Sequence, residues 1–240
     1  MAFRERRRNA EVLAALDLWS GARVLDAGCG TGALLGWLLR RGAMPVGLDP
    51  EPANLLAARE RAPGVPLVAG RGEAMPFADH AFDVVVWFNA LHHVPAEHLD
   101  RALAGSLRVL APEGHLLVVE PLAEGPWFEV MRPLEDETEE RRAAAAAVGR
   151  LVERGAACRI AALEWTDRVR VRDFAALRAR LLAADPARAT VLGRVEAELA
   201  ARFARLARPA GEGLELDQPM RLDLLRPARP SSHSRHEAVT

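Results

Sequence analysis

The sequence predicts an α/β protein whose mostly parallel sheet carries helices on both faces. Three observations support this fold class. Short apolar runs alternate with helical patterns over the first 121 residues, a glycine-rich turn follows the first run at 28–32, and the run at 82–88 is rich in valine. A valine-rich run is typical of a strand that is covered on both faces. Strands and helices that alternate at this spacing form parallel sheets through right-handed crossovers.

Four helices and five strands are expected in this N-terminal half. Apolar residues at helical spacing predict helices at 9–18, 33–41, 53–62 and 96–110. Gly42 suits the C-cap of the second helix, and Pro52 suits the first turn of the third. Short apolar runs predict strands at 23–27, 44–49, 65–70, 82–88 and 115–120.

The C-terminal half has less regular patterns. They predict helices at 135–157, 174–184 and 187–207, and strands within 159–173 and 214–225. The last segment, 227–240, is rich in proline, serine and arginine. We expect it to be a disordered tail.

Composition and charge exclude several classes of protein. The chain has 240 residues, of which half are apolar and 27% are charged, with a net charge of −1. This balance argues against a strongly basic nucleic-acid binder. We find no apolar run long enough to span a bilayer and no signal peptide at the N-terminus. Two cysteines cannot form a disulfide framework, so a cytoplasmic protein is expected.

The glycine-rich turn and a later aspartate point to a nucleoside ligand. Gly28 and Gly30 allow a ligand to approach the backbone closely, and the helix that follows presents free N–H groups. Asp49 ends the second strand, 21 residues after Gly28. A carboxylate at that place can accept hydrogen bonds from both hydroxyls of a ribose. The sequence therefore predicts an adenosine-type ligand at the carboxyl ends of the first two strands.

Two cofactor classes compete for this turn. Gly28, Gly30 and Ala33 fit a dinucleotide fingerprint, whereas Asp26 and the glycines up to Gly32 fit S-adenosylmethionine. The carboxylate of Asp26 favours the second class, because it would repel a pyrophosphate and attract an ammonium or sulfonium group.

Four segments resemble, in order and spacing, the motifs of the class I S-adenosylmethionine-dependent methyltransferases. They are VLDAGCGTG at 24–32, GLDPEPANLLAARERA at 47–62, GRGEAMPFADHAFDVVVWFNALHHV at 70–94 and LRVLAPEGHLLVVEP at 107–121. The group with the greatest similarity acts on small molecules and includes ubiquinone and menaquinone biosynthesis methyltransferases. The resemblance covers residues 10–121. It implies methyl transfer from S-adenosylmethionine to a small-molecule metabolite by in-line displacement, with S-adenosylhomocysteine as the product.

The same resemblance implies a fold and a domain organisation. The expected fold is a Rossmann-like, seven-stranded, mostly parallel sheet in strand order 3-2-1-4-5-7-6, with an antiparallel last strand. Residues 1–226 would form a single methyltransferase domain. Within it, residues 10–121 are the cofactor-binding core and residues 122–226 shape the acceptor site.

The resemblance also assigns cofactor contacts. They fall on Asp26, Gly28, Cys29, Gly30, Gly32, Asp49, Pro50, Gly72, Glu73, Asn89 and Leu91. One position departs from the family pattern, because Arg71 stands where relatives usually have an aspartate that accepts from the adenine amino group. Arginine has no acceptor. Either Glu73 takes this role, or backbone groups of Gly72 and Glu73 contact the adenine.

Candidate catalytic and acceptor-binding residues follow the fourth and fifth strands. His92 and His93 have side chains suited to general-base catalysis, but either could have a purely structural role. The expected acceptor pocket comprises Glu120, Trp127, Phe128 and Met131. Glu120 could instead cap a loop, and the three apolar residues could simply be core. No metal site is expected, because no further ligand pair with metal-like spacing accompanies Glu97 and His98.

Other functions remain open at this point. The chain could bind the cofactor without turnover, as a regulatory or scaffolding protein. It could also methylate RNA or protein, although its near-neutral charge disfavours RNA. A dehydrogenase is a further alternative. The expected partner is a small-molecule acceptor, without membrane contact, and the protein could be a monomer or a homodimer.

Overall fold

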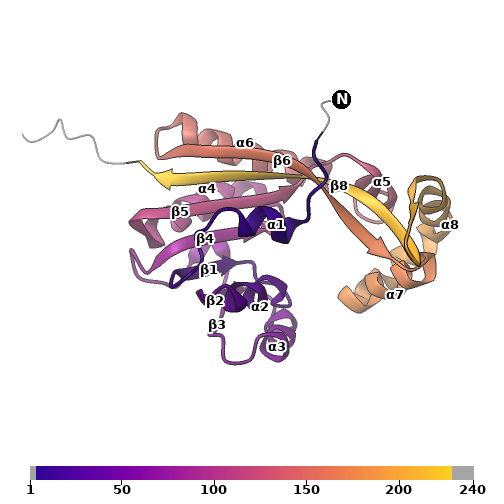
Figure 1. Cartoon of the computed structure of the whole chain (residues 1–240), viewed down its shortest axis with the longest axis horizontal. Helices are drawn as coiled ribbons and strands as arrows, with labels where there is room; N and C mark the ends of the chain where they lie inside the picture. The colour runs from indigo at the N-terminus through magenta and orange to yellow at the C-terminus, as the bar shows by residue number, and fades with distance from the viewer. Residues whose placement is uncertain (1–3, 229–240) are drawn as a thin grey trace, which may run out of the picture.

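The computed structural model describes residues 4–228 and contains one eight-stranded sheet. The strand order is β3-β2-β1-β4-β5-β8-β6, and β7 pairs with β8 outside this path (Figure 1). β1 to β5 are parallel, and β8 lies antiparallel to both β5 and β6. The bounds are β1 (Arg23–Ala27), β2 (Met44–Asp49), β3 (Leu67–Ala69), β4 (Phe82–Phe88), β5 (Leu110–Pro121), β6 (Ala157–Val171), β7 (Arg208–Ala210) and β8 (Gly213–Pro227).

Eight α-helices and four short 3-10 turns connect these strands within the described residues. The helices are α1 (Asn9–Ala14), α2 (Ala33–Arg40), α3 (Pro52–Arg61), α4 (Leu99–Val109), α5 (Pro126–Met131), α6 (Thr138–Glu153), α7 (Phe174–Ala184) and α8 (Ala189–Leu206). The turns are η1 (Gly72–Ala74), η2 (Leu91–His93), η3 (Ala96–His98) and η4 (Pro186–Arg188).

Strand β4 shows why this sheet has two covered faces. Val85 and Trp87 are buried in a core that includes side chains of α4 and α6. Val84 and Val86 are buried in a second core, with side chains of α1 and α2. Because successive side chains of a strand point to opposite faces, an uninterrupted apolar run is needed where both faces are covered. The α/β fold class expected from the sequence is confirmed.

The C-terminal third adds a third core beside the sheet. β6 and β8 continue together past the other strands, and α5, α7 and α8 lie around their extension (Figure 1). Leu177, Leu199, Phe203 and Leu216 are buried there with Val130 of α5. This arrangement places the C-terminal segments next to the carboxyl ends of the parallel strands, where residues following β4 and β5 also lie.

The sheet has eight strands within the described residues, and not the seven that were expected. The expected order is found, with β8 in the place of the seventh strand, but a short hairpin precedes it. Ala210 of β7 pairs with Gly213 of β8 across a two-residue turn in which Gly211 has φ +62°. In the sequence, the helical pattern runs to about residue 207, and the three residues of β7 that follow show no pattern typical of a strand.

Several element boundaries also differ from expectation. β5 begins at Leu110, five residues earlier than its apolar run, and α1 ends at Ala14, before Asp17 takes a left-handed φ of +50°. The helix over 126–131 was not expected from the sequence. Pro227 belongs to β8, and residues 229–240 of the expected tail lie outside the described residues. Among residues 4–228, we find no helix long and apolar enough to cross a membrane.

Candidate functional site

A cavity of about 450 Å³ lies at the carboxyl ends of β1, β2 and β4. Its walls come from the glycine-rich turn, the loops after β2 and β3, and the chain just before and after η2. The lining residues that the sequence predicts as cofactor contacts are Gly28, Gly30, Asp49, Pro50, Gly72, Glu73 and Asn89. Arg71 and His93 also line the cavity, although the sequence suggested other roles for them. The lining residues that the sequence did not single out are Leu48, Glu51, Asn54, Gly70, Trp87, Ala90, Val94 and Pro95. The cavity therefore forms at the edge of the sheet where the motifs place a nucleoside.

The glycine-rich turn is held close to the neighbouring strand. The backbone N–H groups of Gly28 and Cys29 both donate to the carbonyl of Leu48, at 2.8 and 3.0 Å. Gly28 has φ +73°, and a Cβ atom at this position would lie 2.6 Å from Cβ of Ala90. Only glycine satisfies both constraints. The turn can therefore pack directly against Ala90, in the chain that follows β4.

Asp49 is held in the cavity by three hydrogen bonds. Its Oδ2 accepts from the N–H of Gly30 at 2.8 Å, and its Oδ1 accepts from the N–H of Glu51 at 2.9 Å and from the side-chain amide of Asn54 at 3.1 Å. The residue is 5% exposed. Each carboxylate oxygen can accept more than one hydrogen bond. A carboxylate fixed in this way can accept further hydrogen bonds from vicinal hydroxyls of a ligand.

Asp26 lies two residues before Gly28 and does not line the cavity. It is 1% exposed, and its Oδ2 has no hydrogen-bond partner among the described residues. Burial, and then the negative charge of Asp49, raise the pKa of Asp26 to about 7. A buried carboxylate oxygen without a partner is costly. A cationic group beside the glycine-rich turn would relieve this cost, so the residues present fit a ligand that carries an ammonium group.

Three other predicted contacts also lie outside the cavity. Leu91 is fully buried in the core on the α4 and α6 side of the sheet. Gly32 packs against the backbone of Ala58 in α3. The Cys29 thiol lies against Gly47, and burial, followed by the charges of Asp26 and Asp49, raises its pKa to about 12. The side chain of Cys29 therefore packs inside the protein as a thiol.

The loop after β3 closes one side of the cavity over Trp87. A Cβ atom on Gly72 would lie 2.2 Å from the Trp87 ring, whose N–H donates to the Ser106 hydroxyl at 2.9 Å. Arg71 turns outward, with 70% of its side chain exposed and its guanidinium 3.9 Å from Glu73. The Glu73 side chain is largely buried and lines the cavity. Glu73 thus offers the side-chain acceptor that Arg71 lacks.

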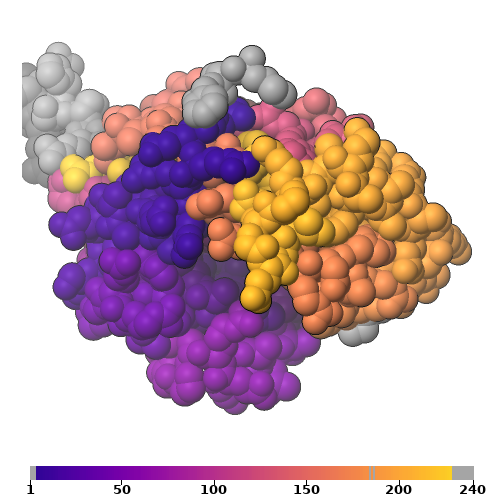
Figure 2. All heavy atoms as spheres, turned by 45° about the vertical axis from the view of Figure 1, so that its right-hand side comes forward, coloured from indigo at the N-terminus to yellow at the C-terminus, as the bar shows by residue number. Residues whose placement is uncertain are grey.

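A second cavity, of about 390 Å³, adjoins the first. Figure 2 shows the surface hollowed where the N-terminal half meets the orange C-terminal segments. Trp127, Phe128 and Met131 line this cavity as expected, with Leu181, Val169 and Met220. Its charged and polar lining, which the sequence did not single out, comprises Asn9, Glu135, Glu137, Arg141, Asp167, Arg180, Arg188 and Gln218. The pocket is therefore partly apolar and contains both signs of charge.

Asn89 and His93 line both cavities. Asn89 follows β4 and has φ +51°, and its N–H donates to the carbonyl of Val119 at 2.9 Å. A positive φ is uncommon outside glycine, although asparagine tolerates it better than most residues. Strained backbone of this kind clusters at functional sites. The junction of the two cavities is thus built by the chain directly after β4.

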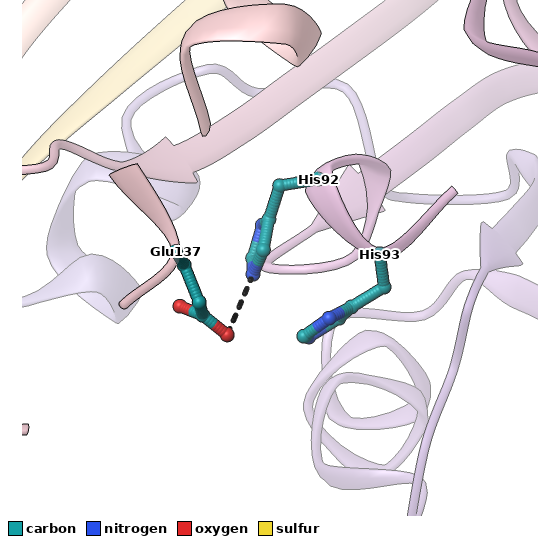
Figure 3. Close-up of side chains that lie close together, drawn as sticks. All are labelled: His92, His93 and Glu137. Atoms are coloured by element: carbon teal, nitrogen blue, oxygen red, sulfur yellow. Dashed lines mark ion pairs between the residues drawn. The ribbon is translucent and has the colours of Figure 1, made fainter. Parts of the chain in front are cut away.

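His92 is buried between two carboxylates. Its Nδ1 is hydrogen-bonded to Oε2 of Glu120. Its Nε2 lies 3.8 Å from Oε1 of Glu137, the ion pair that the dashed line in Figure 3 marks. Burial alone would lower the pKa of His92, but the hydrogen bond and charge of Glu120, and then the charge of Glu137, raise it. Burial and the neighbouring His92 lower the pKa of His93. Both histidines line the second cavity.

Glu120 supports the loop and does not line the second cavity. Its Oε1 accepts from the N–H groups of Ala90 and Leu91, at 3.1 and 2.8 Å. Of the two roles left open for Glu120, the geometry therefore favours the cap of this loop.

Comparisons with known proteins agree with this geometry. Residues 25–118 match the model of a family described as a methyltransferase domain. The chain is 42% identical over 101 residues to the phthiotriol/phenolphthiotriol dimycocerosates methyltransferase of Mycobacterium leprae, covering 40% of this chain and 37% of that protein. It is 38% identical over 122 residues to the demethylmenaquinone methyltransferase of Thermobifida fusca, covering 49% of this chain and 51% of that protein. The chain thus spans about half the length of these relatives or less.

A solved structure shows the same fold over nearly the whole chain. It is a Bacillus halodurans protein classed provisionally as a methyltransferase, with a TM-score of 0.61, 19% identity, and coverage of 90% of this chain and 97% of that one. The family match over 25–118 includes the glycine-rich turn and all the residues that line the first cavity. Residues 25–118 of this chain therefore match a methyltransferase domain in sequence, and nearly the whole chain has the fold of the Bacillus halodurans structure.

Proposed function

We propose that this protein transfers a methyl group from S-adenosylmethionine to a small-molecule acceptor. The observation that carries the proposal is the pair of adjoining cavities, of about 450 and 390 Å³, which share Asn89 and His93. The first has the features of a nucleoside site, and the second is open to a partly apolar molecule. Two ligands bound in these cavities would meet at the shared residues.

The cofactor would be held by residues at the carboxyl ends of β1 to β4. We assign the ribose hydroxyls to Asp49, whose carboxylate is fixed by Gly30, Glu51 and Asn54. The amino group of the methionine part would lie toward Asp26, whose buried Oδ2 has no hydrogen-bond partner within residues 4–228. Pro50 and Glu73 line the cavity farther along the two neighbouring loops and are assigned to the adenine.

S-adenosylmethionine supplies, when bound, an activated methyl group with a neutral thioether as the leaving group. The task left to the protein is to hold an acceptor atom in line, exclude water and accept a proton where the acceptor has one to lose. Trp127, Phe128 and Met131 provide apolar contact for the acceptor. His92 and His93 are the candidate proton acceptors at the junction. With Nδ1–H of His92 donated to Glu120, its Nε2 lone pair faces the second cavity.

The proposal also covers the domain organisation, the cellular compartment and the kind of partner. We assign residues 1–226 to one domain, because β8 joins the C-terminal segments to β5 inside the same sheet. We place the protein in the cytoplasm, since Cys29 and Cys158 are both free thiols. A small molecule suits the second cavity better than a nucleic acid does, because that cavity has acidic as well as basic walls.

The test combines a binding and a turnover measurement on the full chain. Titration calorimetry with S-adenosylhomocysteine is expected to show one saturable site. Mass spectrometry of a panel of phenolic, quinol and amine acceptors, incubated with protein and S-adenosylmethionine, is expected to reveal a product heavier by one methylene unit. No binding of S-adenosylhomocysteine would overturn the proposal. Binding without turnover on any acceptor would favour a regulatory protein instead.

A further inference from the structure

Three potential metal ligands meet at the wall of the second cavity. The ring nitrogens of His92 and His93 and a carboxylate oxygen of Glu137 all lie within 4.8 Å of one another (Figure 3). We propose that this cluster binds a single divalent transition-metal ion, with zinc as the best match. The site is additional to the proposed methyl transfer and does not depend on it.

The donor set has the composition of an open metal centre. Two imidazole nitrogens and one carboxylate oxygen are ligands that zinc accepts in catalytic sites, where the fourth position is left to water or substrate. The sequence could not reveal this set, because Glu137 lies 44 residues after His93 and directly precedes α6. The fold brings the start of α6 beside η2, and the three side chains converge only there.

Neighbouring residues orient two of the ligands. The hydrogen bond from Nδ1 of His92 to Glu120 leaves the Nε2 lone pair toward Glu137. Metal-binding histidines usually donate their second nitrogen to a carboxylate in this way. Arg141 donates to Oε2 of Glu137 at 2.6 and 3.1 Å, which leaves Oε1 on the side of His92. Glu120 thus orients a metal ligand, whereas Glu137 is itself a ligand.

The spacing of the donors is compatible with a tetrahedral ion. Zinc–nitrogen and zinc–oxygen bonds near 2.1 Å place two ligands of a tetrahedron about 3.4 Å apart. His92 Nε2 and Glu137 Oε1 are 3.8 Å apart, so they need to move by less than an ångström. His93 keeps a solvent-exposed side, so its ring can rotate toward the pair. The charge of Arg141 is opposed by Glu120 and Glu137, while the nearby Glu135 is paired with Arg188. The groups around the ligands therefore keep an excess of negative charge, which favours a cation.

The location suggests what the ion would do. All three ligands line the second cavity, and His93 also lines the first. A zinc ion lowers the pKa of a hydroxyl group that it coordinates. This role rests on the proposed function, whereas the metal site itself does not. A ligating Nε2 of His92 has no lone pair left for a proton, so the metal and the general base are alternative roles for this side chain.

The test is metal binding to the cofactor-free, chelator-treated full chain. A Cys158→Ser background removes the exposed thiol. Calorimetry with zinc chloride is expected to show one equivalent bound. Cobalt(II) is expected to give the intense visible absorption of a tetrahedral site without a thiolate charge-transfer band. His93→Ala and Glu137→Gln are each expected to weaken zinc binding by about 100-fold or more, because loss of a ligand should cost at least as much as loss of a residue that supports one.

His98→Ala is the matched control, because His98 lies outside the cluster and its removal should leave zinc affinity unchanged. Absence of saturable zinc binding would overturn the inference, as would equal affinity in the His93→Ala protein. Binding of magnesium in preference to zinc would also overturn it, because magnesium prefers oxygen ligands. Since no cofactor is present, a negative result leaves the proposed methyl transfer untouched.

Discussion

The carboxylate of Glu120 holds both the side chain of His92 and the loop that carries it. One oxygen accepts from the backbone N–H groups of Ala90 and Leu91, and the other is hydrogen-bonded to Nδ1 of His92. Glu120 is near the end of β5, and η2 follows β4, so the contact joins the ends of two adjacent strands. The position of His92 at the second cavity therefore depends on a residue that does not line that cavity.

Two substitutions of Glu120 should separate its contact with the loop from its contact with His92. Glu120→Ala leaves two part-buried N–H groups and a buried imidazole without their partner. We expect it to lower the free energy of unfolding by about 2 kcal/mol or more. Glu120→Gln keeps one acceptor oxygen for Ala90 and Leu91, so it should cost less stability while it disturbs the orientation of His92. Urea denaturation of both variants checks this order, and equal loss in both would contradict it.

The sequence predicted the N-terminal half of the fold well because its elements have strong local signals. The valines of β4 indicate burial on both faces, and Asp49 and Gly28 lie in motifs with a fixed spacing. The short β7 was missed, because three residues that include Pro209 carry no strand pattern. Fold class and cofactor were thus accessible from local patterns.

Much of the candidate site was less accessible, because it depends on contacts across the fold. Glu137 and His92 are far apart in the chain and meet only through the packing of α6 against η2. Asn54 has no motif that marks it as a partner of Asp49, and no local signal distinguishes a cavity-lining Gly30 from a buried Cys29. Loop positions next to a motif can be predicted, whereas the direction of each side chain cannot.

Asp49→Asn should weaken cofactor binding. The substitution removes the negative charge and places a donor NH₂ group where a carboxylate oxygen now accepts from the N–H of Gly30 or from that of Glu51. Hydrogen bonds to charged groups contribute about 1.5–3 kcal/mol, so the Kd for S-adenosylhomocysteine should rise by at least about tenfold. Asp83→Asn is the matched control, because Asp83 pairs with Arg23 outside both cavities. Calorimetry that finds the same Kd for the Asp49 variant and wild type would contradict the assignment.

Asp26 should make the ligand-free protein less stable as pH rises. Its pKa is about 7 in the folded protein, against 3.8 for the free side chain. Between these values the folded state binds more protons than the unfolded state, so this contribution to stability is present at low pH and lost as pH rises toward 7. Asp26→Asn removes the ionisation. The free energy of unfolding of this variant, minus that of wild type, should therefore increase between pH 5 and pH 8. Below the pKa of Asp26 in the folded protein, the increase should be on the order of 1 kcal/mol per pH unit. A pH-independent difference in urea denaturation would contradict the expected titration.

Gly72 and Gly105 should respond in opposite directions to the same substitution. A Cβ on Gly72 would lie 2.2 Å from the Trp87 ring, which the hydrogen bond to Ser106 keeps in place. Gly72→Ala should therefore destabilise the protein by about 1–3 kcal/mol. A Cβ on Gly105, inside α4, meets its nearest atom at 3.7 Å. Gly105→Ala should stabilise the protein by up to about 1 kcal/mol through helix propensity. Thermal and urea unfolding of the pair test this contrast, which fails if both variants shift the same way.

Trp127→Ala should affect the acceptor and spare the cofactor. Trp127 lines the second cavity and not the first, and the Arg180 guanidinium lies 6.0 Å from its ring centroid. Loss of the apolar contact should raise the KM of an acceptor found in the turnover assay by about tenfold or more, since a large side chain contributes about 1.5–3 kcal/mol when fully buried. The Kd for S-adenosylhomocysteine should stay within about twofold of wild type, because Asn89 and His93 are the described residues that the two cavities share. An unchanged KM for the acceptor would contradict this prediction. If the Kd for S-adenosylhomocysteine also rose, Trp127 would belong to the cofactor site and the acceptor would bind elsewhere.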